Sequence, residues 1–184
     1  HVGGDFFQFY ALDDDRLLFV LADVTGHGME AAIPMVMFNG ILESQIEMGG
    51  SLEDLFVRLN HSLCRTLDQR TFVCCSMGKV DLATQQLKLM NAGCPYPYLF
   101  KASVGNLIEQ EMDGYPLGVS HKADHPVIRA QLEPGDRVIL CSDGIVEADN
   151  EKLEQFGFER TQEMILKHCV KGRSSEGMSD DIFK

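Results

Sequence analysis

The sequence is organised around a short stretch at residues 22–28, which reads Ala22-Asp23-Val24-Thr25-Gly26-His27-Gly28. An apolar run, Leu17–Leu21, leads into this stretch, and a pattern typical of a helix, Met29–Met48, follows it. The stretch is therefore predicted to be a strand-to-helix turn, where glycines permit a positive φ and a close approach of the backbone. An aspartate at the end of a buried strand is costly unless it is paired or holds a cation. Asp23 is thus the first indication of a metal site.

Composition narrows the class of protein. The chain has 184 residues, of which 45% are hydrophobic and 24% charged, and this is enough to bury the core of one domain. The formal net charge of −12 argues against a surface for nucleic acid or anionic lipid. It suits a protein that gathers carboxylates around divalent cations, although many ordinary cytosolic proteins are equally acidic.

The cysteines indicate the cellular compartment, and the start of the chain indicates a domain of a longer protein. Six cysteines occur without any Cys-x-x-Cys pair, and most lie in apolar runs, which predicts reduced, buried thiols in a cytoplasmic protein. No signal peptide and no apolar run long enough to span a bilayer is found. The chain begins at His1, already inside a motif, so we expect residues 1–184 to be a domain excised from a longer protein.

The first third of the chain predicts a hairpin followed by two helices. Residues 2–10 and 16–23 are expected to be antiparallel strands, the second of them central and covered on both faces. A helix is predicted from about Glu30 to Met48, and Pro34 would kink it if it began as early as Gly28. Gly49-Gly50 ends this helix. A second helix, residues 51–67, begins with Ser51 as N-cap and carries one apolar stripe.

After Thr71 the hydrophobic period changes to that of strands. Six strands are predicted, at residues 72–80, 86–91, 98–101, 106–109, 127–132 and 138–141. A short helix at residues 153–155 and a longer one at 159–170 follow, and residues 172–181 are polar. Antiparallel strands with helices segregated around them predict an α+β layered fold.

Acidic residues recur beside small residues and predicted strand ends, at Asp5, Asp23, Asp143 and Asp180-Asp181. Each of them alone is more often a turn residue than a metal ligand. Together they fit Mg²⁺ or Mn²⁺, which prefer oxygen ligands. Two such ions about 4 Å apart can share and activate a bridging water.

An ordered set of motifs resembles a known family. The motifs are Gly3-Gly4-Asp5-Phe6, Asp23 to Gly28 with Ala31-Ala32, Asn91-Ala92-Gly93, Pro116-Leu117-Gly118, Pro134-Gly135-Asp136, Ser142 to Glu147 and Asp180-Asp181-Ile182. In this order they resemble the metal-dependent protein phosphatases of the protein phosphatase 2C type. The closer resemblance is to the bacterial branch that contains the sporulation stage II E phosphatase and the regulators of stress sigma factors.

The resemblance implies a four-layer α-β-β-α sandwich of two antiparallel sheets, with two Mn²⁺ or Mg²⁺ ions at one edge. Asp23 matches the bridging ligand, Val24 a backbone-carbonyl ligand and Asp5 the acid of the first motif. Asp143 and Asp180, with Asp181 beside it, match the remaining ligands.

His27 matches the family's proposed general acid, which protonates the leaving serine or threonine oxygen. The alternative is a turn histidine that bonds to the backbone. The implied reaction is direct attack of the activated water on phosphorus without a phosphoenzyme, so Cys141 is expected to be core and not a nucleophile.

The chain departs from the family pattern in three places. Phe183 replaces a threonine and the chain stops at Lys184, so we expect these residues to lack the family's terminal strand. Cys94 stands where relatives often have histidine. The basic phosphate anchor of some eukaryotic relatives has no counterpart.

Two functions remain open. The first is a phosphoserine/phosphothreonine phosphatase acting on a phosphorylated regulatory protein, such as an anti-sigma-factor antagonist. The alternative is a catalytically impaired phosphatase fold that binds a partner in the same signalling role, and a metal-dependent phosphodiesterase ranks third. Such domains usually follow an upstream sensory or receiver domain and can form homodimers.

Overall fold

The computed structural model describes residues 4–26, 28–68, 70–150 and 152–172. Within it the chain divides into two compact units, each described here by itself. The first unit comprises His1–Cys94 and Glu111–Gln131, and the second comprises Pro95–Gln110 and Leu132–Lys184.

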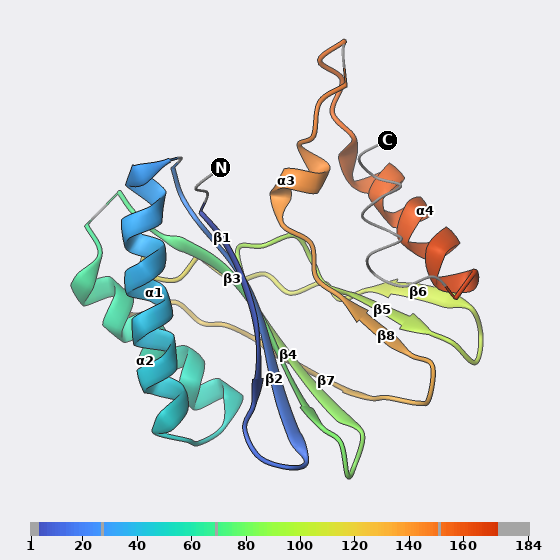
Figure 1. Cartoon of the computed structure of the whole chain (residues 1–184), viewed down its shortest axis with the longest axis horizontal. Helices are drawn as coiled ribbons and strands as arrows, with labels where there is room; N and C mark the ends of the chain where they lie inside the picture. The colour runs from blue at the N-terminus through green and yellow to red at the C-terminus, as the bar shows by residue number, and fades with distance from the viewer. Residues whose placement is uncertain (1–3, 27, 69, 151, 173–184) are drawn as a thin grey trace. The chain divides into compact units, whose positions relative to one another are not determined.

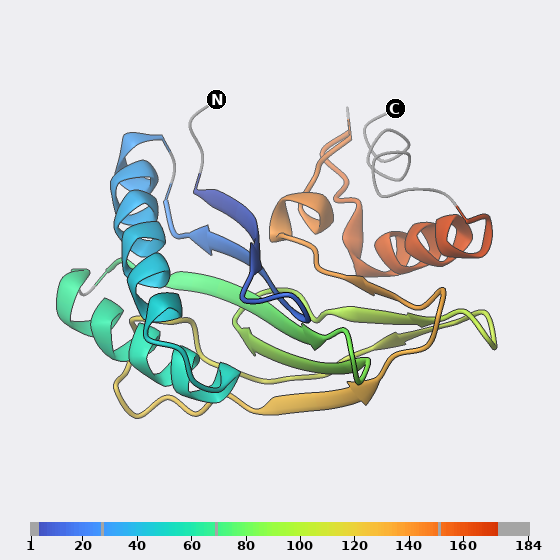
Figure 2. The ribbon, with the colours of Figure 1, turned by 60° about the horizontal axis from the view of Figure 1, so that its bottom comes forward.

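The first unit is built on a five-stranded antiparallel sheet with the order β1-β2-β3-β4-β7 (Figure 1). The strands are β1 Asp5–Ala11, β2 Arg16–Val24, β3 Val73–Asp81, β4 Gln86–Ala92 and β7 Val127–Gln131. Two helices, α1 Met29–Glu47 and α2 Leu52–Thr66, lie side by side on one face of this sheet, as Figures 1 and 2 show. The predicted hairpin and the helix pair are therefore confirmed.

Strand β2 lies inside the sheet, between β1 and β3. Its residues alternate along the strand, so that Leu18, Val20, Ala22 and Val24 are buried while the residues between them are half-buried. The buried set faces the helices because α1 packs on β2 and contributes Phe38 to the same core cluster. Period-two alternation places one face of a strand on the core.

The corner between α1 and α2 follows the sequence signals closely. Gly49 and Gly50 have φ of 68° and 102°, a backbone conformation that side chains with a Cβ avoid. The Ser51 hydroxyl then accepts from the Asp54 N–H at 3.0 Å, and the Asp54 carboxylate accepts from the Ser51 N–H at 3.1 Å. This is the predicted N-cap, in its reciprocal capping-box form.

Helix α1 begins one residue earlier than predicted, at Met29, with Gly28 as its N-cap. Pro34 is therefore the sixth helical residue, beyond the first turn. It has no N–H to donate to the Glu30 carbonyl, so one hydrogen bond of the helical ladder is lost at this position. The helix continues through it because its apolar side is held by the core residues Ala31, Met35 and Phe38.

The second unit is smaller. It contains a three-stranded antiparallel sheet of order β6-β5-β8, with β5 Tyr98–Lys101, β6 Asn106–Glu109 and β8 Arg137–Ile139. Helix α4, Gly157–Val170, contacts β6 and the short helix α3, Asp143–Val146. Tyr98 and Phe100 from the sheet pack with Ile165 and Cys169 from α4.

Two antiparallel sheets with flanking helices confirm the predicted fold class. The short helix predicted at residues 153–155 is wrong. The Asn150 side-chain oxygen accepts from the N–H groups of Lys152 and Glu154, and Leu153 has a φ of 61°, so this segment is a turn. Helix α3 was not predicted, because four residues are too few to show a helical period.

In the part of the chain that the structure describes, no helix is both long enough and apolar enough to cross a membrane.

Candidate metal centre

The β1–β2 hairpin places two of the predicted ligands directly opposite each other. In the register of the two strands, Asp5 pairs with Asp23. Directly opposed residues of an antiparallel pair project from the same face with Cβ atoms about 5 Å apart, and like charges in this position are destabilising. Asp5 is exposed and Asp23 is half-buried. A divalent cation held by the two carboxylates would remove this repulsion.

Gly4 is packed against the candidate ligand oxygens. An ideal Cβ at this buried residue would lie 2.6 Å from the Val24 carbonyl oxygen and 2.8 Å from Asp23 Oδ1. The Val24 N–H also donates to the Gly4 carbonyl at 3.2 Å. The predicted carbonyl ligand and one carboxylate oxygen of Asp23 therefore lie around the same point, and only glycine leaves them in place.

Thr25 anchors the loop that follows these ligands. Its N–H donates to the Phe72 carbonyl at 3.1 Å, and its hydroxyl accepts from the Phe72 N–H at 3.2 Å. The chain then turns at Gly26 and Gly28, whose φ values are 108° and 62°. This role of Thr25 was not predicted. The only signal was its place inside the motif, because its partner lies 47 residues away.

Other predicted site residues fall elsewhere. Asp143 is exposed and opens α3 in the second unit. His27, Asp180 and Asp181 lie outside the described residues, as do Phe183 and the polar segment from residue 173 onward. Within residues 4–26, 28–68, 70–150 and 152–172, no three His, Cys, Asp or Glu side chains gather in a group that could hold a metal ion.

The donor atoms that the first unit does bring together suit a hard cation. They are Asp23 Oδ1 and the carbonyl oxygen of Val24, which both lie next to Gly4, and Asp5 is opposite Asp23 in the strand register. Mg²⁺ and Mn²⁺ prefer such oxygen ligands and retain several waters, so a small protein donor set on one side is compatible with them. These three residues therefore fit the predicted metal.

The buried cysteine near Asp143 is not set up for nucleophilic chemistry. Cys141 packs against Tyr98 and Phe100, and burial raises the pKa of its thiol to about 11. The reactive form of cysteine is the thiolate, so Cys141 is unreactive near neutral pH. All six cysteines lie in the described part of the chain, and none forms a disulfide. This confirms the prediction of buried, reduced thiols for Cys75, Cys94, Cys141 and Cys169.

Several of the other motifs are structural. The Asn91 side chain accepts from the Ser76 hydroxyl and donates to the Cys94 carbonyl at 2.9 Å, which closes the Asn-Ala-Gly turn. Leu117 and Val73 exchange two backbone hydrogen bonds of 2.8 and 3.0 Å. In the second unit, Asp136 forms an ion pair with Lys101.

Asn60 is a buried polar residue that the sequence analysis did not single out. Its side chain accepts from the Gly118 N–H and donates to the Ser120 carbonyl, each at 2.9 Å. It thereby holds the Pro-Leu-Gly motif against α2. The apolar stripe of α2 gave no signal for this role, since the partners lie about 60 residues away.

Comparison with known proteins agrees with this architecture. The family model described as "Stage II sporulation protein E (SpoIIE)" matches residues 13–184. The phosphoserine phosphatase RsbU of Bacillus subtilis (strain 168) is 26% identical over 185 residues, which cover 99% of this chain and 53% of RsbU. The chain thus spans about half the length of this relative.

Two solved structures share the fold. The SiaA-PP2C domain of Pseudomonas aeruginosa superposes with a TM-score of 0.83 at 22% identity, covering 98% of this chain and 73% of that one. A crystal structure of RsbX in complex with magnesium gives a TM-score of 0.74 at 20% identity, covering 99% and 79% of the two chains.

Proposed function

Because the chain belongs to the stage II sporulation protein E (SpoIIE) family, we propose that it is a metal-dependent phosphatase of phosphoserine and phosphothreonine in a signalling protein. The observation that carries the proposal is the cross-strand register that sets Asp5 opposite Asp23, with the Val24 carbonyl beside Asp23 Oδ1. Like charges on directly opposed residues of an antiparallel strand pair repel each other, and a bound cation would offset this repulsion. The 26% identity to a phosphoserine phosphatase over almost the whole chain supports the same reaction class.

We propose roles for each candidate residue. Asp5, Asp23 and the Val24 carbonyl would hold divalent ions, Mg²⁺ or Mn²⁺. When bound, such ions supply Lewis-acid activation of water and neutralise the charge of the phosphate. Asp143, Asp180 and Asp181 are proposed as the remaining ligands.

Other residues of the chain position the groups that we propose for hydrolysis of the phosphate ester. Gly4 leaves room for the Asp23 carboxylate, and Thr25 fixes the following loop to Phe72. His27 is proposed to donate a proton to the leaving serine or threonine oxygen, since an imidazole can hold and release a proton near neutral pH. Cys141 takes no part, because its thiol stays protonated near neutral pH.

The substrate and the wider assembly are part of the same proposal. We propose that residues 1–184 form one phosphatase domain of a longer, cytoplasmic regulator that also carries a sensory or receiver domain and can form a homodimer. The substrate is a small phosphorylated regulatory protein, such as an anti-sigma-factor antagonist. The similarity to the phosphoserine phosphatase RsbU, of which the chain spans about half, supports a phosphoserine substrate.

The decisive experiment is a Mn²⁺-dependent assay on p-nitrophenyl phosphate and on a phosphoserine protein, with Mn²⁺ binding followed by calorimetry. Asp23→Asn should lower turnover by more than about 100-fold, since even residues that only support a ligand cost 10- to 100-fold. The matched control is Asp14→Asn, the same change at an exposed residue in the turn of the same hairpin.

The outcomes separate the two candidate functions. Turnover in the wild type that Asp23→Asn abolishes and Asp14→Asn preserves supports the phosphatase. Mn²⁺ binding without turnover on either substrate would instead support the impaired binding module. Equal background hydrolysis by wild type and Asp23→Asn refutes the enzyme.

A further inference from the structure

A cavity in the first unit lies away from the candidate metal centre. It is bounded by the end of β1, the start of β2, β3 and the corner between α1 and α2, and its volume is about 480 Å³. This lies within the range of small-molecule sites. Arg16 begins β2 and Asp23 nearly ends it, so the two residues lie roughly 23 Å apart along the strand. The cavity is therefore separate from the proposed phosphatase chemistry.

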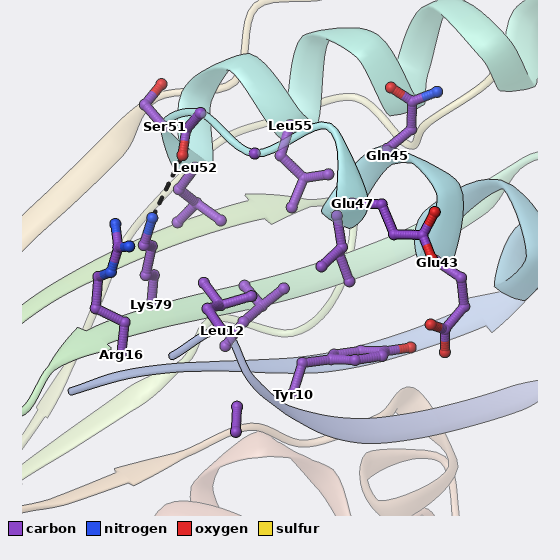
Figure 3. A pocket seen from close by; sticks show the side chains of 15 residues that line it. Tyr10, Leu12, Arg16, Glu43, Gln45, Glu47, Ser51, Leu52, Leu55 and Lys79 are labelled. Carbon is purple, nitrogen blue, oxygen red and sulfur yellow. Dashed lines mark hydrogen bonds between the residues drawn. The ribbon is translucent and has the colours of Figure 1, made fainter. Parts of the chain in front are cut away.

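The residues that line the cavity form an apolar, a basic and an acidic group. Its apolar lining is formed by five aliphatic side chains, Leu12, Leu18, Ile46, Leu52 and Leu55. Figure 3 shows Arg16 and Lys79 together on one side, and Glu43 and Glu47 on the other. A bound molecule would thus meet a cationic end, an apolar middle and an acidic end.

At the cationic end Arg16 forms an ion pair with Asp13, whereas Lys79 has no carboxylate partner among the described residues. Arg16 Nε donates to Asp13 Oδ2 at 2.6 Å, whereas the Lys79 ammonium donates to the Gly50 carbonyl at 3.4 Å. Partial burial, followed by the positive charges of Arg16 and Lys88, lowers the pKa of Lys79, and Asp13 and Glu53 offset this only in part. An anion placed beside Arg16 and Lys79 would stabilise the Lys79 charge.

The Tyr10 hydroxyl adds a polar group to the wall. Tyr10 Oη is buried and points toward the Glu43 carboxylate, as Figure 3 shows. Burial, then the negative charge of Glu43 and a hydrogen bond with its side chain, raise the pKa of Tyr10 to about 12, so the hydroxyl keeps its proton.

We propose that this cavity binds a small amphipathic organic monoanion. The anionic group lies beside Arg16 and Lys79, and the apolar body covers the leucine side chains. Glu43 and Glu47 disfavour a second negative charge at the far end. The ligand class is therefore a carboxylate or sulfonate with one apolar body, and not a dianion.

The test uses two fluorescent probes that differ in a single charged group. 8-Anilinonaphthalene-1-sulfonate has an aromatic body with one sulfonate, and N-phenyl-1-naphthylamine has the same rings without it. Both are titrated into the 184-residue chain. We expect saturable binding of the sulfonate, and an affinity for it at least about tenfold higher than for the uncharged amine, because hydrogen bonds to charged groups are the stronger ones.

Variants identify the site. The double variant Arg16→Gln/Lys79→Gln should weaken the sulfonate at least about tenfold and leave the uncharged amine within about twofold. The matched control is Lys88→Gln, because Lys88 pairs with Glu53 and does not line the cavity. Ala11→Leu, at an exposed residue of the cavity wall, should weaken both probes.

Circular dichroism establishes that each variant is folded, and amide NMR shifts show where the probe binds. Sulfonate-induced shifts at Gly49, Gly50 and Leu52 support the proposal. Sulfonate binding that is equally weakened by Lys88→Gln, or that is insensitive to the double variant, refutes it. Shifts spread over the chain without saturation refute it as well.

Discussion

Gly4 offers the sharpest test of the site geometry, through the substitution Gly4→Ala. The new methyl group would lie 2.6 Å from the Val24 carbonyl oxygen and 2.8 Å from Asp23 Oδ1, and 3.3 Å from the Ala31 Cβ. The first contact is with backbone of the central strand β2 and cannot be relieved by a rotamer change. Either the backbone around Gly4 or the Asp23 side chain must move.

The expected cost follows from the overpacking of a well-packed interior, about 1–3 kcal/mol. If the backbone moves, the free energy of unfolding falls by this amount. If Asp23 moves instead, the cost appears as weaker metal binding, roughly 5- to 150-fold, since 1.4 kcal/mol corresponds to tenfold. The two measurements together should account for the whole penalty.

Urea denaturation gives the free energy of unfolding, and calorimetric titration with Mn²⁺ gives the affinity. The matched control is Gly40→Ala in α1, where a Cβ would have no atom within 4 Å. Alanine is favoured over glycine inside a helix, so this control should stabilise the protein by about 0.5–1 kcal/mol and leave Mn²⁺ affinity unchanged. A Gly4→Ala protein with wild-type stability and wild-type affinity would contradict the packing of Gly4 against the two ligand oxygens.

Three further predictions concern other parts of the chain. Replacing Ser51 by alanine removes the acceptor of the Asp54 N–H and should cost about 1 kcal/mol in urea denaturation; no change would show that the capping box is not formed in solution. For Asp136, burial raises the pKa, but the hydrogen bond from the Lys101 ammonium and two backbone N–H groups hold it below its usual range. Its stabilisation should therefore be present above about pH 4 and disappear as the pH falls through the lowered folded pKa, so that Asp136→Asn shows a smaller loss between pH 7 and pH 3 in urea denaturation than wild type does. Cys141→Ser should keep phosphatase turnover, and the thiol with its pKa of about 11 should resist iodoacetamide at pH 8, which mass spectrometry can follow; rapid alkylation of the folded chain would overturn this.

Local signals account for much of the fold. The strand boundaries of β5 and β6 agree with prediction to the residue, because turn residues on both sides delimit short apolar runs. The corner at Gly49-Gly50 and Ser51 was also predictable, since glycine conformation and N-capping depend on neighbours in sequence. The helix predicted at residues 153–155 was wrong, because the Asn150 side chain accepts hydrogen bonds from the backbone N–H groups of Lys152 and Glu154 and stabilises a turn instead.

The candidate site, too, was predictable from the sequence only in part. The motif around Asp23 pointed to a metal ligand, and the hairpin register then set Asp5 opposite it. The roles of Asp143, Asp180 and Asp181 depend on segments distant in the chain and remain predictions, as does the role of His27.

The sequence by itself determined the local elements of this protein: the hairpin of β1 and β2, the capped helix pair and the oxygen-rich motif that ends at Gly28. These follow from alternation, helical period and turn chemistry, which act over a few residues. Only the tertiary structure decided that Gly4 packs on the Val24 carbonyl, that Thr25 is held by Phe72, and that Asn60 fixes Gly118. Each of these contacts joins residues far apart in the chain, where close packing and hydrogen-bond geometry select the partner and no local pattern specifies it.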